Sequence, residues 1–100
     1  MHFLLMYDLA ADYLERRAMY RAAHLALAQA SAARGEMVLA GALTDPADMA
    51  ILHFQGDSPA AAEAFAVADP YVTEGLVTRW RVRPWHTVIG AAAAHPLPPL

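Results

Sequence analysis

Cysteine and lysine are both missing from this 100-residue chain, and each absence excludes a class of chemistry. Without Cys there are no disulfides, no thiolate nucleophiles and no cysteine-built zinc sites. All seven basic residues are Arg, which excludes a lysine Schiff base and a lysine-containing phosphate loop. The chain also lacks a Gly-x-Ser-x-Gly nucleophile motif and a dinucleotide-binding glycine motif. We therefore expect a protein that works without a cofactor.

Charge is scarce as well, at 17% of the residues, and acidic residues outnumber basic ones by ten to seven. A net charge of −3 does not favour binding to a phosphate backbone. Arg79, Arg81 and Arg83 alternate along the last expected strand, but a sheet that reads RNA would add stacking aromatics and a basic surplus. We expect no nucleic-acid partner.

Long hydrophobic runs are absent too. Asp8, Asp12 and Glu15 follow the opening apolar stretch almost at once, so no segment reaches the roughly 18–20 apolar residues that a membrane span needs. The opening stretch also lacks the basic residues that begin a signal peptide. These features favour a cytoplasmic protein that does not bind a membrane.

The 58% hydrophobic content is enough for one core, so we expect one domain at residues 1–90 and an Ala- and Pro-rich tail at 91–100. The tail is expected to be disordered or swapped onto a neighbour. Strand patterns at 2–8, 36–43, 48–55 and 76–82, the last able to continue toward 89, alternate with helical patterns. The helices are expected at 12–34, stopped by Gly35, and from Pro59, capped by Ser58, to about 69, with one further turn at 71–75.

The order strand, helix, strand, strand, helix, strand predicts an α+β fold of the ferredoxin-like kind, an antiparallel sheet with two helices on one face. The first strand is apolar on both faces, with Phe3, Leu5 and Tyr7 on one side and Leu4 and Met6 on the other. Because the helices cover only one face, we expect the open face to pack against a second copy, as in a dimeric α+β barrel. The sequence thus predicts a homodimer.

The first helix carries polar groups near its expected core face. At 100° per residue, Arg21 falls in the middle of one stripe, with Arg17 and His24 on its flank. The stripe consists of Leu14, Ala18, Arg21, Leu25, Ala28 and Ala32. Because a buried guanidinium needs compensation, Arg21 should have an acidic or anionic neighbour. The alternative is that both arginines extend past the sheet edge into water and His24 is a half-buried histidine of structural importance only.

Asp69 also has two interpretations. An Asp followed by Pro is a good N-cap for the short turn that follows it. The same carboxylate could bind His24, and the pair would form a general acid/base unit. The five histidines do not show the close spacing of a compact metal site, so we expect no metal.

Several motifs resemble the YciI-like (YCII-related) family in order and approximate spacing, over residues 2 to about 90. They are FLLMYD at 3–8, RxxHL at 21–25, AGAL at 40–43, ADPYV at 68–72, GLV at 75–77 and RPW at 83–85. The resemblance implies a ferredoxin-like, dimeric α+β barrel protein with a His–Asp pair in a pocket at one end of the sheet. Carried onto this sequence, the pair is His24 and Asp69, with Arg21 and Tyr71 beside it.

The resemblance further implies chemistry similar to that of a dehydrochlorinase acting on a chlorinated hydroxyquinol, in a fold that muconolactone isomerase shares. Our first hypothesis is therefore a lyase or isomerase of small hydroxylated ring compounds. His24 and Asp69 would be catalytic, Arg21 would bind an anionic oxygen, and Tyr7 and Tyr71 would shape the substrate pocket. The alternative hypothesis is a non-catalytic, dimeric module that binds a small ligand or serves an accessory role.

Overall fold

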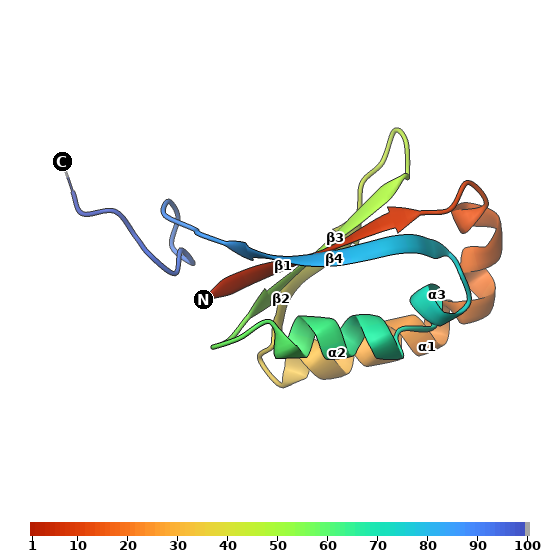
Figure 1. Ribbon diagram of the computed structural model, residues 1–100, viewed down its shortest axis with the longest axis horizontal. Coiled ribbons are helices and arrows are strands. Elements are labelled where there is room, and N and C mark those ends of the chain that lie inside the picture. The colour runs from red at the N-terminus through yellow and green to blue at the C-terminus, as the bar shows by residue number, and fades with distance from the viewer. Residues whose placement is uncertain (100) are drawn as a thin grey trace.

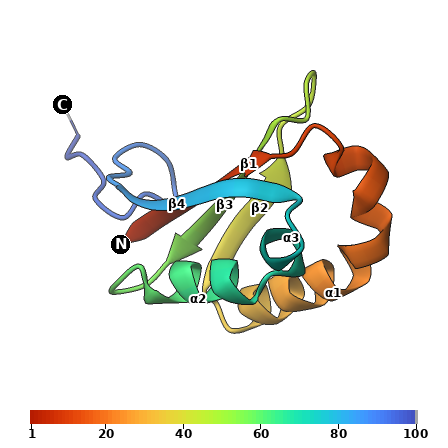
Figure 2. The same cartoon turned by 45° about the vertical axis from the view of Figure 1, so that its right-hand side comes forward.

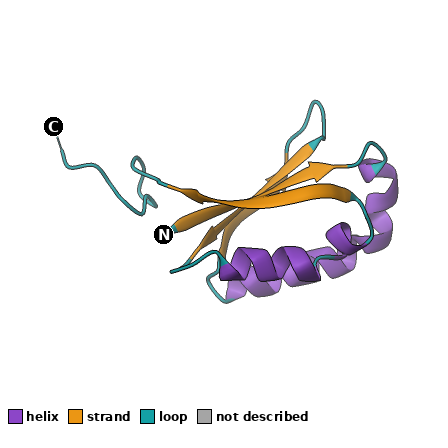
Figure 3. Ribbon diagram, in the orientation of Figure 1, coloured by secondary structure: helices purple, strands orange, loops and turns teal. Residues whose placement is uncertain are grey.

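The computed structural model describes residues 1–99 as a layer of strands covered on one face by helices (Figure 1, Figure 3). The elements are β1 (His2–Leu9), α1 (Tyr13–Ala33), β2 (Met37–Ala42), β3 (Met49–Gln55), α2 (Ala60–Ala68), α3 (Pro70–Thr73) and β4 (Val77–Trp85). All neighbouring strands pair antiparallel in the order β2-β3-β1-β4. The predicted ferredoxin-like βαββαβ fold is confirmed, with the short α3 as the expected extra turn.

The ends of the helices follow local sequence. α1 stops because Gly35 adopts a φ of +78°, the left-handed conformation that a glycine tolerates best, and its N–H donates to the Ala32 carbonyl. α2 begins at Ala60 with Pro59 as its N-cap, one residue later than predicted. The Ser58 hydroxyl still accepts a hydrogen bond from the Ala60 N–H at 3.3 Å.

The core lies between the sheet and the helices, and β1 runs through its centre. Phe3, Leu5 and Tyr7 point toward the helices and are 0–2% exposed. Phe3 pairs with Phe54 and Leu5 with Leu52 of β3, so large side chains lie next to one another on the inner face. Leu4 and Met6 project from the other face and are only partly buried. The first strand is therefore apolar on both faces, as predicted.

The predicted stripe of α1 is wrong by about one residue of rotation. Leu14 is 57% exposed and Arg21 is exposed, whereas Tyr13 and Ser31 are buried and Tyr20 packs against the core. Alanines on several sides of this helix give the sheet little preference for one face, so the large tyrosines decide the rotation. Figure 2 shows α1 running under the sheet beside α2, with α3 between α1 and the start of β4.

The segment after β4 extends past the N-terminal end of β1 (Figure 1). It folds back on itself through Thr87, while the expectation that residues 91–100 are disordered or swapped onto a neighbour stays a prediction. The Thr87 hydroxyl lies 2.9 Å from His2 Nδ1 and accepts from the Ala94 N–H, and the Thr87 carbonyl accepts from the His95 N–H. Leu100 lies outside the described residues, and the division of the chain at residue 90 stays a prediction.

Within residues 1–99, none of the helices combines the length and the apolar character that crossing a bilayer requires.

Candidate active site

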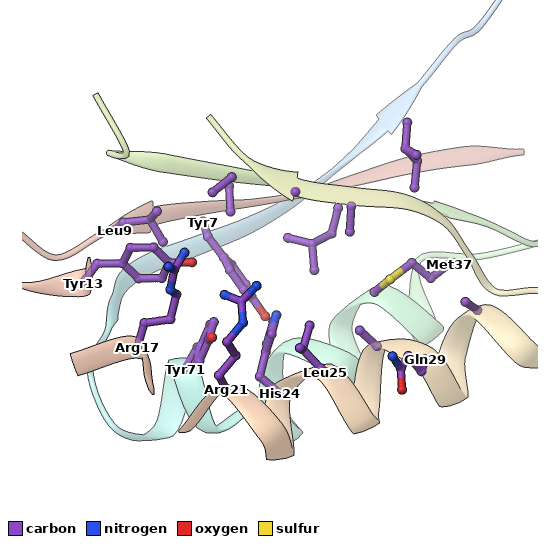
Figure 4. A pocket seen from close by; sticks show the side chains of 18 of the residues that line it. Tyr7, Leu9, Tyr13, Arg17, Arg21, His24, Leu25, Gln29, Met37 and Tyr71 are labelled. Carbon is purple, nitrogen blue, oxygen red and sulfur yellow. The ribbon is translucent and has the colours of Figure 1, made fainter. Parts of the chain in front are cut away.

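A cavity of about 480 Å³ lies between α1 and the helix-facing side of β1, β2 and β3. Figure 4 shows its two different ends. Tyr13, Arg17 and Arg21 lie toward one end, and Leu25 and Met37 lie toward the other. The cavity is therefore polar and cationic at one end and apolar at the other, as in a site for a small organic molecule.

Asp69 is the fully buried carboxylate beside this cavity, with 0% exposure. It is the residue between α2 and α3, and its Oδ1 accepts the Tyr71 N–H at 3.0 Å, which makes it the N-cap of α3. Its Oδ2 accepts the Tyr7 hydroxyl at 2.8 Å, and its Oδ1 lies 2.9 Å from Nδ1 of His24. The cap and the contact with His24 are thus compatible, because the carboxylate has two oxygens to offer.

His24 reaches Asp69 from α1, across 45 positions of the chain. Its ring stacks on Tyr71 at a centroid distance of 3.9 Å and an angle of 6°, and it meets Phe65 edge-on at 6.1 Å. Because a carboxylate only accepts, Nδ1 carries the proton in this contact, and the neutral ring then keeps its lone pair on Nε2. Nε2 has no partner among residues 1–99, and the side chain, 16% exposed, lines the cavity.

Tyr7 lines the cavity, in keeping with its expected place in the substrate pocket. Its hydroxyl in addition donates to Asp69. Burial raises the pKa of Tyr7 far above its usual value, and the negative charge of Asp69 and the hydrogen bond to it raise that pKa further. The phenol therefore stays protonated at physiological pH and positions the carboxylate.

Arg21 is exposed rather than buried, so the expectation that it needs an acidic neighbour is wrong, whereas the other expected neighbour, an anion, stays a prediction. Within residues 1–99, no carboxylate oxygen lies within 4.0 Å of the guanidinium of Arg21 or Arg17. Asp69, the buried acid of this region, already accepts from His24, Tyr7 and the backbone. Because Arg21 sits at the exposed edge of the cavity, water can solvate its charge and no buried ion pair is required.

Tyr71 belongs to α3, lines the cavity and is 3% exposed. Its hydroxyl is a buried group with no hydrogen-bond partner in the described part of the chain. Burial raises the pKa of Tyr71, and nearby Tyr13 raises it too, against the opposing effect of Arg21 and Arg17. Tyr13 meets the Tyr71 ring edge-on at 5.8 Å, and the Arg17 guanidinium carbon lies 5.8 Å from the Tyr13 ring centre.

Sequence reasoning named five site residues, and the structure brings all of them to this region: His24, Asp69, Arg21, Tyr7 and Tyr71. It missed Tyr13 and gave Arg17 only a place on the flank. The helical spacing of 13, 17, 20 and 24 would have grouped these residues with His24 on one face.

The remaining histidines lie elsewhere. His2 and His53 meet edge-on at 4.4 Å, and His86 stacks on His95 in the tail. In the part of the chain that the structure describes, no three potential ligands from His, Cys, Asp and Glu converge as a metal site would need.

The fold and the site together define the class: an α+β protein of the ferredoxin-like, α+β barrel kind, with a polar cavity between its long helix and its sheet. Residues 1–86 match the family model of the YCII-related domain, so the chain belongs to the YCII-related family, as its motifs predicted. It is 37% identical over 87 residues to Protein YciI of Escherichia coli O6:H1 and to Protein YciI of Shigella flexneri, which covers 78% of this chain and 89% of each relative.

A solved structure with a similar fold is the 5-chloro-2-hydroxyhydroquinone dehydrochlorinase TftG of Burkholderia phenoliruptrix AC1100, in complex with 2,5-dihydroxybenzoquinone. The TM-score is 0.70 at 26% sequence identity, and the match covers 87% of this chain and 95% of that chain. The predicted fold class is therefore confirmed by comparison as well.

Proposed function

We propose that this protein is a cofactor-independent enzyme of the lyase or isomerase type, which acts on a hydroxylated ring compound by acid/base chemistry. The observation that carries the proposal is the contact of His24 Nδ1 with Asp69, with Nε2 left open to the cavity. A positioned imidazole is the side chain most often used to move protons near neutral pH.

His24 is the general base and Asp69 is its positioning carboxylate. Nε2 takes a proton from a carbon or hydroxyl of the substrate, and Asp69 stabilises the imidazolium that forms. In an elimination, the electron pair left behind forms a double bond while the leaving group departs with its own bonding pair. In an isomerisation, the imidazolium returns the proton to a different atom. Both reactions balance without an oxidant or a reductant.

The solved neighbour supports the substrate class in this proposal. It is named a dehydrochlorinase of a chlorinated hydroxyhydroquinone, and it is complexed with a dihydroxybenzoquinone. A cavity of about 480 Å³ suits a ligand of that size, and Tyr71 and Tyr13 offer aromatic surfaces beside His24. Arg21 and Tyr71 are assigned to substrate binding, and Tyr7 to holding Asp69.

The test is turnover of a panel of chlorinated and hydroxylated ring compounds, followed by absorbance and by chloride release. Replacement His24→Asn should lower the rate of any turnover by about 10²–10⁴-fold, the usual contribution of a general base. His86→Asn is the matched control, because His86 directly follows β4, is exposed and does not line the cavity. Equal activity of the two variants would reject the mechanism, and binding without turnover by the wild type would favour the non-catalytic module.

We also propose that the protein forms a homodimer through the open face of the sheet. Leu4, Met6 and Ile51 lie side by side on that face, and no element of residues 1–99 covers them. Light scattering should give twice the monomer mass at micromolar concentration. Met6→Lys should shift the mass toward the monomer because it places a charge in the apolar patch, whereas Met19→Lys on the outer side of α1, where Met19 is 80% exposed, should leave it unchanged. A monomeric wild type would contradict the proposal.

A further inference from the structure

The charge of the cavity is opposite to that of the protein. The whole chain has a net charge of −3, yet the charged side chains that line the cavity within residues 1–99 are Arg17 and Arg21, and none is acidic. Both guanidinium groups extend from α1 into the cavity (Figure 4). Two like charges one helical turn apart repel each other unless an anion lies between them or near them. Asp69 does not fill that place, because it is more than 4.0 Å from both guanidinium groups and is held by its own partners.

A second, independent observation points to the same place. The Tyr71 hydroxyl is buried and has no partner in the described part of the chain, although the rest of the residue is held firmly by its N–H bond to Asp69 and by stacking on His24. A buried hydroxyl without a hydrogen-bond partner costs free energy. Its presence therefore indicates a ligand that accepts a hydrogen bond from the Tyr71 hydroxyl. Because the pKa of Tyr71 is raised by burial, the hydroxyl is a neutral donor at physiological pH.

The other end of the cavity narrows the choice of occupant. Beyond His24, Figure 4 shows Leu25, Gln29 and Met37, so this part of the lining is mostly apolar. A small inorganic anion would leave this surface wet, whereas an organic anion would cover it with an apolar body. The distribution of charge and apolar surface therefore fits an amphipathic molecule lying along α1.

We propose that the cavity binds an organic anion whose charged oxygens lie between Arg17, Arg21 and the Tyr71 hydroxyl, with its ring beside His24 and its apolar edge toward Leu25. The anion is either a carboxylate on the ring or an ionised ring oxygen, since both present oxygen acceptors to a guanidinium fork. Arg17 thereby becomes a specificity-determining residue alongside Arg21. The inference rests on the proposed function for its catalytic meaning, while the binding itself requires no turnover.

The test is calorimetric titration of the full chain with three small ring compounds that each carry hydroxyl groups at positions 2 and 5. They are 2,5-dihydroxybenzoate, 2,5-dihydroxybenzamide and 2,5-dihydroxybenzoquinone. The benzoate or the quinone should bind at least about tenfold more tightly than the neutral amide, since a hydrogen bond to a charged group is stronger than a neutral one. Tight binding of the benzoate would identify the anionic group of the ligand as a carboxylate, and tight binding of the quinone would identify it as an ionised ring oxygen. Equal affinities for all three probes, or no binding of any of them, would overturn the inference.

Arginine variants locate the effect. Arg17→Gln and Arg21→Gln should each lower the affinity for the preferred anion about tenfold and leave the affinity for the amide unchanged. Arg34→Gln is the matched control, because Arg34 is the C-cap residue of the same helix, pairs with Glu36 and does not line this cavity. Raising the salt concentration should lower the affinity for the anion more in the wild type than in Arg17→Gln. An equal loss of affinity in Arg34→Gln would overturn the inference.

Tyr71→Phe separates binding from folding. Since the hydroxyl has no partner in the free protein, its removal should leave the Tm at or above the wild-type value and still weaken the anion severalfold. A lower Tm with unchanged affinity would overturn the inference. If the anion preference is found and His24→Asn has no effect on any turnover, the proposed function fails and the inference stands. If turnover requires His24 but the amide binds as well as the anions, the inference alone fails.

Discussion

Removal of the Asp69 carboxylate is the sharpest test of how the site is built into the fold. In Asp69→Ala, α3 loses its N-cap, which stabilises a helix by about 1 kcal/mol. Tyr7 is only 1% exposed, and its hydroxyl loses its acceptor. An unsatisfied buried donor costs about 1–3 kcal/mol. We expect the free energy of unfolding to fall by about 3 kcal/mol, most of it from these two losses.

Urea denaturation followed by circular dichroism measures this change, and thermal unfolding should show a Tm lower by roughly 12–24 °C, at 4–8 °C for each kcal/mol in a chain of this size. Asp12→Ala is the matched control. Asp12 is the N-cap of α1, but its side chain is 56% exposed and makes no capping hydrogen bond. Its replacement should cost under about 0.5 kcal/mol. If Asp69→Ala costs no more than Asp12→Ala, the carboxylate does not hold the site together.

Asp69→Asn should behave differently because an amide can keep one hydrogen bond to each of the same three neighbours, although the Tyr7 hydroxyl then accepts instead of donating. Its oxygen accepts the Tyr71 N–H, and its NH₂ group can donate to the Tyr7 oxygen and to Nδ1 of His24. We expect a stability loss of about 1–2 kcal/mol, from exchanging charged acceptors for neutral ones. Function should suffer far more, because a donor facing Nδ1 forces the His24 proton onto Nε2 and removes the base from the cavity.

The remaining predictions concern single groups. Nitrogen NMR of the imidazoles should find the His24 proton on Nδ1 in the wild type and on Nε2 in Asp69→Asn, and an unchanged tautomer would contradict the assignment. Tyr7→Phe should lower the free energy of unfolding in urea by about 1–2 kcal/mol, against almost none for Tyr20→Phe, whose hydroxyl makes no hydrogen bond within residues 1–99. The pKa of Tyr7 is raised on folding, so its stabilising effect is complete below the unfolded value of 10.0 and is lost as the pH rises above it. Alkaline titration of stability should therefore show a shallower decline in Tyr7→Phe than in the wild type. Gly35→Ala should cost about 1 kcal/mol of stability by thermal unfolding, because φ is +78° while a Cβ would meet nothing within 4 Å; a neutral result would mean that the backbone there relaxes freely.

Local patterns in the sequence were enough to predict the elements and their order. Gly35 ended the first helix, Asp69 before a proline ended the second, and alternation along the first strand separated the face with Phe3, Leu5 and Tyr7 from the face with Leu4 and Met6. Such features act over a few residues of backbone, so they are readable without knowing what the chain packs against. The pairing of His24 with Asp69 was only one of two open interpretations on local grounds, and the family motifs favoured it.

The tertiary structure decided the rest of the site. An alanine-rich helix has little preference for one face, so packing of Tyr13 against the core fixed the rotation of α1 and turned Arg21 to the edge of the cavity without an acidic partner. The Tyr7 hydroxyl meets Asp69 across 62 positions, and the two arginines line the same cavity as Tyr71 only because α1 and α3 pack against each other. Contacts between distant segments depend on how the helices pack against the sheet, and no local pattern encodes that packing.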